Sequence, residues 1–272
     1  MSKSSSPLIL VTNDDGIRSP GLLAAVQACL PLGELLIAAP VVQQSGVGRA
    51  KPSTSGGRIL AETIAVAGHS FTGYAIEGSP AQVVEHALVE LAARPVGLCI
   101  SGINYGENIG EGITVSGTVG AAMEAASVAV PALAISLETA PEHYFSHSLE
   151  VEFAVAAHFV YHFASVALQQ GLPPGVDLLK IDIPKNATIH TPWRWTRSSR
   201  QRYFHAIAPR RVHLSDPVPM GFRTGFDAER LEPDSDIQAL AVDQVVSVTP
   251  VDLDMTARVD FGELAAWFGD GR

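Results

Sequence analysis

The sequence has few cysteines, few basic residues and no long uninterrupted apolar run, and each shortage excludes a class of protein. Its two cysteines, Cys29 and Cys99, lie far apart within apolar segments, which is typical of buried thiols and not of a disulfide framework. The 18 lysines and arginines are outnumbered by 28 aspartates and glutamates, so the formal net charge is −10. Such a surface does not attract phosphate backbones, and we expect no nucleic acid polymer as a partner.

Membrane and export signals are also missing. The most apolar longer stretch, residues 121–137, contains Glu124 and Pro131 and therefore does not qualify as a membrane span. The tail at residues 1–6 is polar. The apolar run that follows it ends at an acidic pair and is too short for the core of a signal peptide. We therefore expect a cytoplasmic protein with no membrane partner. Its 272 residues, 47% of them hydrophobic, are enough for a sizeable core.

Apolar runs that end at prolines or polar loops alternate with segments of helical period. We expect buried strands at residues 8–12, 35–39, 96–100, 132–137 and 178–183, and helices at 20–30, 80–93, 117–129 and 153–168. Residues 59–66 and 71–76 alternate in polarity, which indicates a hairpin-like insertion with a turn at Gly68. The alternation of strands and helices predicts an α/β fold with a mostly parallel sheet and right-handed crossovers.

The last third of the chain differs in character. Residues 193–211 are rich in arginine and aromatic side chains without a clear helical period, and residues 245–249 indicate a short strand. We expect hairpins or arms that pack on the core or on another subunit. The run at 193–211 has the composition to stack bases and contact phosphates, but the acidic character of the whole chain favours an interface arm.

Two adjacent carboxylates follow the first strand. The apolar run stops at Asn13, Asp14, Asp15 and Gly16. Neighbouring aspartates repel each other unless a cation lies between them or one stays protonated, so the pair suggests a metal site. Asn-Asp-Asp-Gly is equally good turn composition, and a solvated turn is the alternative for this stretch alone.

Small-residue loops follow two more strands, with Ser45 after the second and Asn104 after the third. Taken singly, each is more often an ordinary loop or turn residue. Because the carboxyl ends of neighbouring parallel strands share one crevice, both residues can converge with Asp14 and Asp15. The resulting all-oxygen set suits Mg²⁺, Mn²⁺ or Ca²⁺.

A helix opens near Ser116, Gly117 and Thr118. The first turn of a helix offers free N–H groups and the positive end of the helix dipole, which suit a phosphate. A cation site and an anion site in one crevice suggest phosphoryl chemistry.

Four segments resemble the signature blocks of the SurE survival-protein family. They are Asn-Asp-Asp-Gly at 13–16, Ser-Gly-Val-Gly at 45–48, the glycine- and asparagine-rich segment 101–110, and residues 116–124. Residues 246–250, with Asp254 and Thr256, resemble the C-terminal block of the family. The blocks occur in the order of the family and span most of the chain, so we identify residues 1–272 as a single domain similar to this family.

The resemblance implies a metal-dependent phosphatase that acts on nucleoside monophosphates, a 5′- or 3′-nucleotidase that in some members also trims polyphosphate. It implies a Rossmann-like core over residues 7–190 with helices on both faces of the sheet. A closing region with β-hairpin or arm elements, residues 191–272, would build homodimers or homotetramers. One divalent cation per subunit would be held at Asp14, Asp15, Ser45 and Asn104.

The sequence departs from the family pattern at a few places. Lys180 and Asp182 lie in a strand in which many members have asparagines, and Gln244 lies where a glycine is common. Gly-Ser-Pro-Ala-Gln-Val at 78–83 replaces Gly-Thr-Pro-Ala-Asp-Cys. None of these departures falls on an expected metal ligand, so they concern substrate preference and the oligomer interface.

The mechanism we expect is in-line attack of water on a phosphomonoester whose oxygens are held by the cation. Asp14 or Asp15 would orient this water or accept its proton. Asn108 and the amides of residues 116–118 would hold the phosphate oxygens.

Two other functions compete with this one. Haloacid-dehalogenase phosphatases also place aspartate and glycine after a first strand, but Asn13 occupies the position of their nucleophilic aspartate. A non-catalytic metal- or nucleotide-binding oligomeric module stays open, because ligand residues establish binding more directly than rate. The pairs His143 with His147 and His158 with His162 lack a third ligand and are expected to be structural or surface histidines. Glu124 is expected to be solvent-facing or locally paired.

Overall fold

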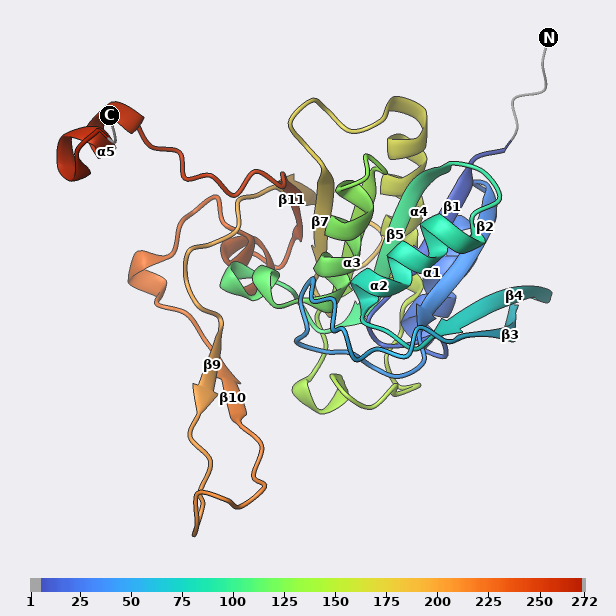
Figure 1. Ribbon diagram of the computed structural model, residues 1–272, viewed down its shortest axis with the longest axis horizontal. Helices are drawn as coiled ribbons and strands as arrows, with labels where there is room; N and C mark the ends of the chain where they lie inside the picture. Colours follow the sequence, from blue (N-terminus) through green and yellow to red (C-terminus); the bar gives the residue numbers. More distant parts are fainter. Residues whose placement is uncertain (1–5, 271–272) are drawn as a thin grey trace.

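A nine-stranded, mostly parallel sheet runs through the centre of the molecule (Figure 1). The computed structural model describes residues 6–270, so only Ser6 of the predicted polar tail lies within the described part. The strands of this sheet are β1 (Leu8–Thr12), β2 (Glu34–Pro40), β3 (Ile59–Val66), β4 (His69–Ile76), β5 (Val96–Tyr105), β6 (Ala132–Leu137), β7 (Leu178–Ile183), β8 (Trp193–Trp195) and β11 (Val246–Val251). Their order is β3-β4-β2-β1-β5-β6-β7-β11-β8, with β3 antiparallel to β4 and β11 antiparallel to β7.

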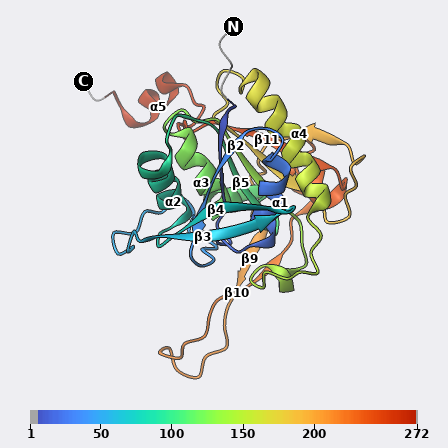
Figure 2. The same cartoon turned by 90° about the vertical axis from the view of Figure 1, so that its right-hand side faces the viewer.

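Helices cover both faces of the sheet. They are α1 (Pro20–Cys29), α2 (Pro80–His86), α3 (Gly117–Ala126), α4 (Ala154–Gln170) and, near the end of the chain, α5 (Phe261–Phe268). Helices α1 and α4 pack on one face and α2 and α3 on the other, so the sheet lies between two helical layers (Figure 2). Each pair buries an apolar surface against the strands. The predicted α/β class is therefore confirmed.

The local sequence explains where these elements begin. All five residues of β1 are buried, as a strand covered by helices on both faces requires. Helix α2 begins at a capping box in which the side chains of Ser79 and Gln82 each accept a hydrogen bond from the backbone N–H of the other. Helix α3 begins after Ser116, whose hydroxyl accepts a hydrogen bond from the N–H of Val119.

Two sequence expectations for the sheet need correction. The hairpin of β3 and β4 is not an insertion, because β4 pairs in parallel with β2 and the hairpin forms one edge of the main sheet. The loop expected from Ser101 begins later, since β5 continues to Tyr105. Pairing with β1 ends at Ser101, and pairing with β6 at Asn104 and Tyr105 keeps the rest of this segment in the sheet, after an irregularity in register between Ser101 and Asn104.

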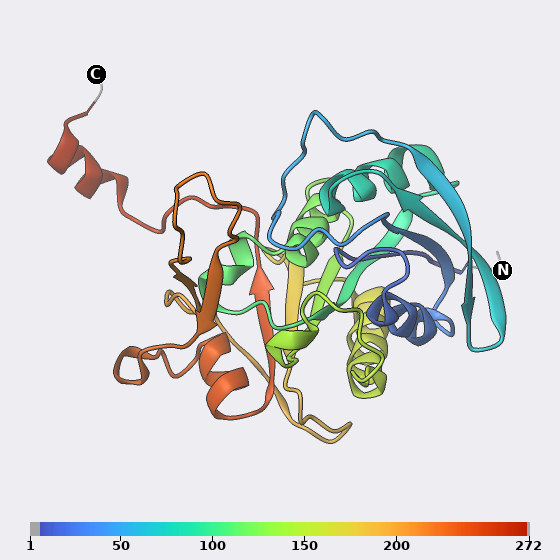
Figure 3. The same cartoon turned by 90° about the horizontal axis from the view of Figure 1, so that it is seen from below.

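The C-terminal third is partly built into the sheet and partly projects from it. Strand β11 lies between β7 and β8, whereas β9 (Phe204–Ile207) and β10 (Gly221–Thr224) form a separate antiparallel hairpin that projects from the body (Figure 1). Helix α5 also stands away from the sheet (Figure 3). Within residues 6–270, no helix has the length and apolar character needed to cross a membrane.

Candidate active site

The turn after β1 presents two carboxylates at the carboxyl end of the sheet. Strand β1 lies between β2 and β5, and a reversal of strand order of this kind opens a crevice beyond the strand ends. The side chain of Asn13 closes the turn, because its Nδ2 donates to the carbonyl of Gly16 at 3.1 Å and its Oδ1 accepts from the N–H of Gly16 at 3.0 Å. Gly16 has a φ of +103°, which favours glycine. Asn13 therefore serves the turn that sets the direction of the following carboxylates.

Asp14 is 4% exposed and contacts the first turn of α3. Its Oδ1 accepts a hydrogen bond from the hydroxyl of Thr118 at 2.5 Å. A Cβ atom at Gly117 would lie 2.7 Å from both Cβ and Oδ2 of Asp14, so glycine is needed to leave room for this carboxylate. Burial raises the pKa of Asp14 to about 6, and the hydrogen bond from Thr118 opposes the shift.

Asp15 is fully buried and held at both oxygens. Nε2 of Gln43 donates to Oδ1 at 2.8 Å, and the N–H of Tyr105 donates to Oδ2 at 3.3 Å. Burial, with the neighbouring charge of Asp14 as a second cause, raises the pKa of Asp15 well above its ordinary value. Two buried carboxylates side by side resist double ionisation, and a cation between them removes this obstacle.

A cavity of about 260 Å³ opens beside Asp14. Five of the predicted site residues line it, and they come from four separate segments: Asp14, Ser45, Asn104, Asn108 and Ser116. The other three, Asp15, Gly117 and Thr118, are outside its lining. Thr118 and Gly117 instead contact the Asp14 side chain, and Asp15 is bonded to Gln43. The cavity therefore collects oxygen ligands and the start of α3 in one place.

Two asparagines reach this cavity from β5 and the loop after it. Nδ2 of Asn104 donates to the carbonyls of the next two residues, at 3.3 and 2.6 Å. Both bonds use the nitrogen, so Oδ1 is the atom that Asn104 offers to a cation. The N–H of Asn108 donates to Oδ1 of Asp182 at 2.7 Å, and its Nδ2 donates to Oγ of Ser136 at 2.8 Å. The second N–H of this amide is available to an anionic ligand.

The loop between β2 and β3 is attached to the turn after β1 and to α3. The N–H of Gln44 donates to the carbonyl of Asp14 at 2.7 Å. Farther along this loop, Arg49 and Lys51 pair with Glu124 of α3 at 2.7 and 2.8 Å. Glu124 is 4% exposed, so of the two alternatives expected for it, pairing is right and solvent exposure is wrong. A buried carboxylate needs such cationic partners.

Residues 9–205 match the model of the family described as survival protein SurE. The chain belongs to the SurE family. A relative named 5′-nucleotidase SurE from Thermococcus kodakarensis is 43% identical over 258 residues, with 94% of this chain and 96% of the relative covered. Another of the same name from Methanosarcina mazei is 38% identical over 271 residues, covering 97% and 98%.

A solved structure shows the same fold. The SurE protein from Aquifex aeolicus superimposes with a TM-score of 0.75 at 27% sequence identity, and the match covers 96% of this chain and 99% of that one. The resemblance to the SurE family seen in the sequence blocks is therefore confirmed, together with the fold that it implies.

In this SurE family member, aromatic side chains also line the cavity. Tyr105 lines it from the end of β5, and four further rings line it from outside the sheet: Tyr144, Phe145, Phe204 and Phe222. The rings of Tyr144 and Phe222 stack 6.0 Å apart with 6° between their planes, and Phe204 meets both edge-on. Phe204 belongs to β9 and Phe222 to β10, so the projecting hairpin reaches the site at its base. An interface arm was expected at residues 193–211, and no sequence pattern marked Phe204 or Tyr144 as cavity residues.

Glu107 is a buried carboxyl group in the same lining. The hydroxyl of Tyr144 donates to its two oxygens at 3.1 and 3.2 Å. Burial raises the pKa of Glu107 to about 7, and the charges of Glu138 and Asp182 act in the same direction. Glu107 lies inside the SurE block at 101–110, so its position could have been noticed in the sequence, but its burial could not.

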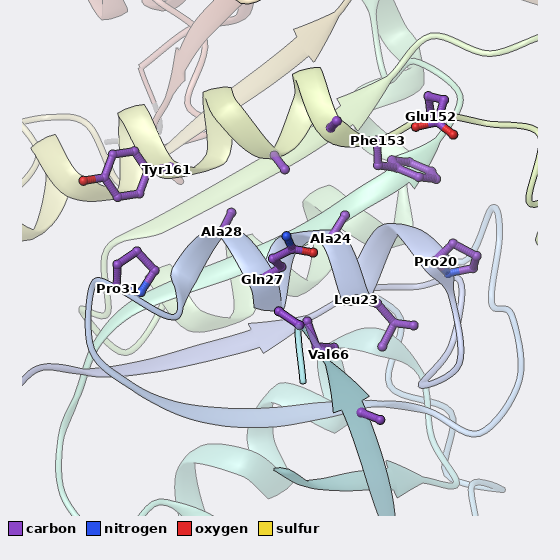
Figure 4. Close-up of a pocket in the computed structure, with 14 residues that line it drawn as sticks. Pro20, Leu23, Ala24, Gln27, Ala28, Pro31, Val66, Glu152, Phe153 and Tyr161 are labelled. Atoms are coloured by element: carbon purple, nitrogen blue, oxygen red, sulfur yellow. The ribbon is translucent and has the colours of Figure 1, made fainter. Parts of the chain in front are cut away.

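Other polar groups and hollows do not add a second site of this kind. Within residues 6–270, no cluster of three or more His, Cys, Asp and Glu side chains could hold a metal, so a cation here depends on the serine and asparagine oxygens. His147 contacts the carbonyl of Asp15 through Nε2 at 2.7 Å. A larger hollow of about 700 Å³ is lined by α1, by the start of α4 and by residues 65–67 at the end of β3 (Figure 4), and Glu152 is the charged side chain of the lining.

Proposed function

We propose that this SurE family member is a 5′-nucleotidase, a phosphoric monoester hydrolase that releases phosphate from nucleoside monophosphates with the help of a divalent cation. The observation that carries the proposal is the pair of buried, neighbouring carboxylates, Asp14 and Asp15, beside a cavity of about 260 Å³ that also holds the start of α3. The relatives named 5′-nucleotidase SurE support the same activity.

The residues present fit a hard divalent cation. Asp14, Asp15, Ser45 and Asn104 offer carboxylate, hydroxyl and amide oxygens, the ligands that Mg²⁺, Mn²⁺ and Ca²⁺ prefer. The burial of both carboxylates leaves their mutual repulsion uncompensated without a positive charge. We therefore propose that these four residues hold one such cation per subunit. When bound, the cation supplies positive charge that polarises a phosphoryl group and lowers the pKa of water.

Other residues hold the phosphate. The amides of residues 116–118 lie at the N-terminus of α3, where unpaired N–H groups and the helix dipole favour an anion. Asn108 adds the free N–H of its side-chain amide. These groups bind the phosphoryl oxygens and become more effective as negative charge spreads over those oxygens in the transition state.

Asp14 orients the attacking water and accepts its proton. Of the two aspartates it is the one that lines the cavity, and the hydroxyl of Thr118 holds it in place at Oδ1. Asn13 supports direct attack by water, because the position of a nucleophilic aspartate is occupied by an amide that is already bonded to Gly16. A covalent aspartyl-phosphate is therefore not part of the mechanism.

The aromatic side chains of the cavity support a nucleoside as the leaving group. Bases stack on aromatic side chains, and here the aromatic rings share one cavity with the phosphate-binding groups. Hydrolysis of 3′-nucleotides and trimming of polyphosphate are further activities that we propose for the same site.

We also propose a cytoplasmic homodimer or homotetramer that assembles through residues 191–272. Phe261, Trp267 and Phe268 of α5 are 69%, 84% and 85% exposed, and an apolar helix face of this kind is usually covered by another chain. The two free thiols, Cys29 and Cys99, are buried, which suits a reducing compartment. Sedimentation of the full chain, with and without residues 252–272, tests the assembly.

A phosphate-release assay over a panel of substrates tests the activity. The panel holds 5′- and 3′-nucleoside monophosphates and polyphosphate, each with Mg²⁺, Mn²⁺ or Ca²⁺ and with a chelator. We expect release from 5′-monophosphates that stops in the chelator and returns with the metal. Metal binding without release from any substrate would instead support the non-catalytic module.

A further inference from the structure

A lysine and two aspartates are buried next to the loop that carries Asn108. Nζ of Lys180 lies 2.5 Å from Oδ2 of Asp182 and 3.1 Å from Oδ2 of Asp236, and all three side chains are 0% exposed. Burial lowers the pKa of Lys180, but the two aspartate charges outweigh it and raise the pKa overall. Buried ion pairs contribute little net stability, because each charge loses its hydration. The other hydrogen bonds of these three side chains therefore indicate their role.

Each aspartate also holds the loop at residues 106–110. Oδ1 of Asp182 accepts the N–H of Asn108 at 2.7 Å, and Oδ2 of Asp236 accepts the N–H of Gly110 at 3.1 Å. Hydrogen bonds from N–H groups to carboxylates are among the stronger ones in proteins. The loop is thus fixed at two backbone positions by two carboxylates that share one lysine.

The sheet register adds a third point of attachment. Asp182 of β7 lies directly opposite Ser136 of β6, and Oγ of Ser136 accepts the side-chain amide of Asn108 at 2.8 Å. Two neighbouring strands therefore bind the backbone and the side chain of the same residue. Asp236 extends the connection to the C-terminal region, since its Oδ1 accepts the N–H of Ser199 at 2.9 Å.

We propose that Lys180, Asp182 and Asp236 act together as a positioning unit that holds Asn108 in place for phosphate. Lys180 orients the two carboxylates, and the carboxylates orient the loop. The catalytic consequence rests on the proposed function, whereas the anchoring of the loop does not.

The chemistry of Asp182 suggests the variant that tests this unit. Its two oxygens accept from two different donors, the ammonium of Lys180 and the N–H of Asn108. In Asp182→Asn a single oxygen and an NH₂ group replace them, so one of these donors loses its acceptor. The double variant Lys180→Met with Asp182→Asn removes the competing ammonium and leaves the amide oxygen for Asn108.

We expect Asp182→Asn to lower kcat for a 5′-nucleoside monophosphate by about tenfold or more, with KM within about twofold. Amide hydrogen exchange of residues 106–110 should become faster. The double variant should restore slow exchange at Asn108, and kcat should recover in part, whereas Gly110 should still exchange fast because Asp236 has lost its cation. Leu178→Ala is the matched control, because Leu178 is buried at the start of the same strand, two residues before Lys180 and on the same side of the sheet. It should lose stability but keep kcat and the exchange of the loop.

Three outcomes overturn the proposal. The first is an Asp182→Asn protein with parental kcat and parental exchange at residues 106–110. The second is a loss of kcat in Leu178→Ala equal to that in Asp182→Asn at matched thermal stability. The third is a folded double variant in which Asn108 exchanges as fast as an unprotected amide, a result that decides the matter even where Asp182→Asn itself fails to fold. If the parent protein releases no phosphate, the proposed function fails, and the exchange measurement alone decides whether the unit anchors the loop.

Discussion

The cavity has a polar part and an aromatic part that are built in different ways. The polar part comes from strand ends and the N-terminus of α3, and its residues Asp14, Asn104 and Ser116 are 4%, 9% and 7% exposed. The aromatic part comes from the loop after β6 and the β9–β10 hairpin, where Phe145 and Phe222 are 66% and 38% exposed. Buried hydrogen bonds hold the first part on the sheet, whereas the second stands on segments outside it.

Because of this difference, we assign the rate of the reaction to the polar part and the affinity for the base to the aromatic part. Groups that must meet a transition state gain from a rigid support, because small displacements cost rate. Rings that stack on a base tolerate movement, and loops accept sequence change more readily than strands. We therefore expect substitutions in the polar part to lower kcat and substitutions in the aromatic part to raise KM.

Replacing Asp15 gives the largest expected effect. Asp15→Asn should retain the fold and lower hydrolysis of p-nitrophenyl phosphate by at least about 100-fold, since even partners of metal ligands matter by 10- to 100-fold. Calorimetric titration with Mn²⁺ should show weaker binding. Asp260→Asn is the control, because Asp260 is an exposed cap of α5 and asparagine caps equally well. A variant that hydrolyses this substrate at the parental rate would remove Asp15 from the site.

Displacing the Asp14 side chain while keeping its charge should have the next largest effect on activity. In Gly117→Ala, the new methyl group meets Cβ and Oδ2 of Asp14 at 2.7 Å and must displace the carboxylate. We expect kcat to fall by about 10- to 100-fold. Gly97→Ala is a matched glycine substitution, since its methyl group would meet its nearest neighbour at an ordinary 3.7 Å. Equal activity of the two variants would show that Asp14 has room to move.

Removing a ring from the aromatic part should change the affinity for substrate more than the rate of hydrolysis. Phe222→Ala removes the ring that stacks on Tyr144, and we expect KM for a nucleoside monophosphate to rise about tenfold, as loss of one stacked base contact predicts. Glycerol phosphate, which has no ring to stack, should be hydrolysed with unchanged kcat/KM. A parallel loss on both substrates would contradict the separation of the two parts.

The smallest effect on activity is expected at Glu107, where the two parts meet through Tyr144. Its pKa rises from 4.5 to about 7 on folding, so its contribution to stability is present below pH 4.5 and is lost as the pH rises to about 7. Glu107→Gln should remove this loss and make the protein more stable than the parent at pH 8, by up to about 3 kcal/mol. Urea unfolding at pH 5 and pH 8 measures the change; identical pH dependence in the two proteins would exclude Glu107 as its source.

The sheet and the polar residues were predictable because they follow short-range rules. The buried run of β1, the capping residue Ser79 and the helix start at Ser116 each carry their own local pattern. The placing of Ser45 and Asn104 beside Asp14 follows from the general rule that carboxyl ends of parallel strands share a crevice.

The remaining features depend on contacts between residues distant in sequence. Tyr144 reaches the cavity through stacking on Phe222, and Gln43 is placed by Asp15 and the carbonyl of Tyr144. The extension of β5 past Ser101 depends on pairing with β6. No local pattern encodes such partners, so the aromatic part of the cavity could not be derived from the sequence.

Helix α3 contacts the two loops that meet at the cavity. Thr118 in its first turn bonds Asp14, and Glu124 farther along pairs with Arg49 on the loop after β2. A helix of ten residues is stiff over its length of about 15 Å, so thermal displacement of α3 moves both attachments together. The separation between the β1 turn and the β2 loop should therefore fluctuate less than the position of either one against the rest of the molecule.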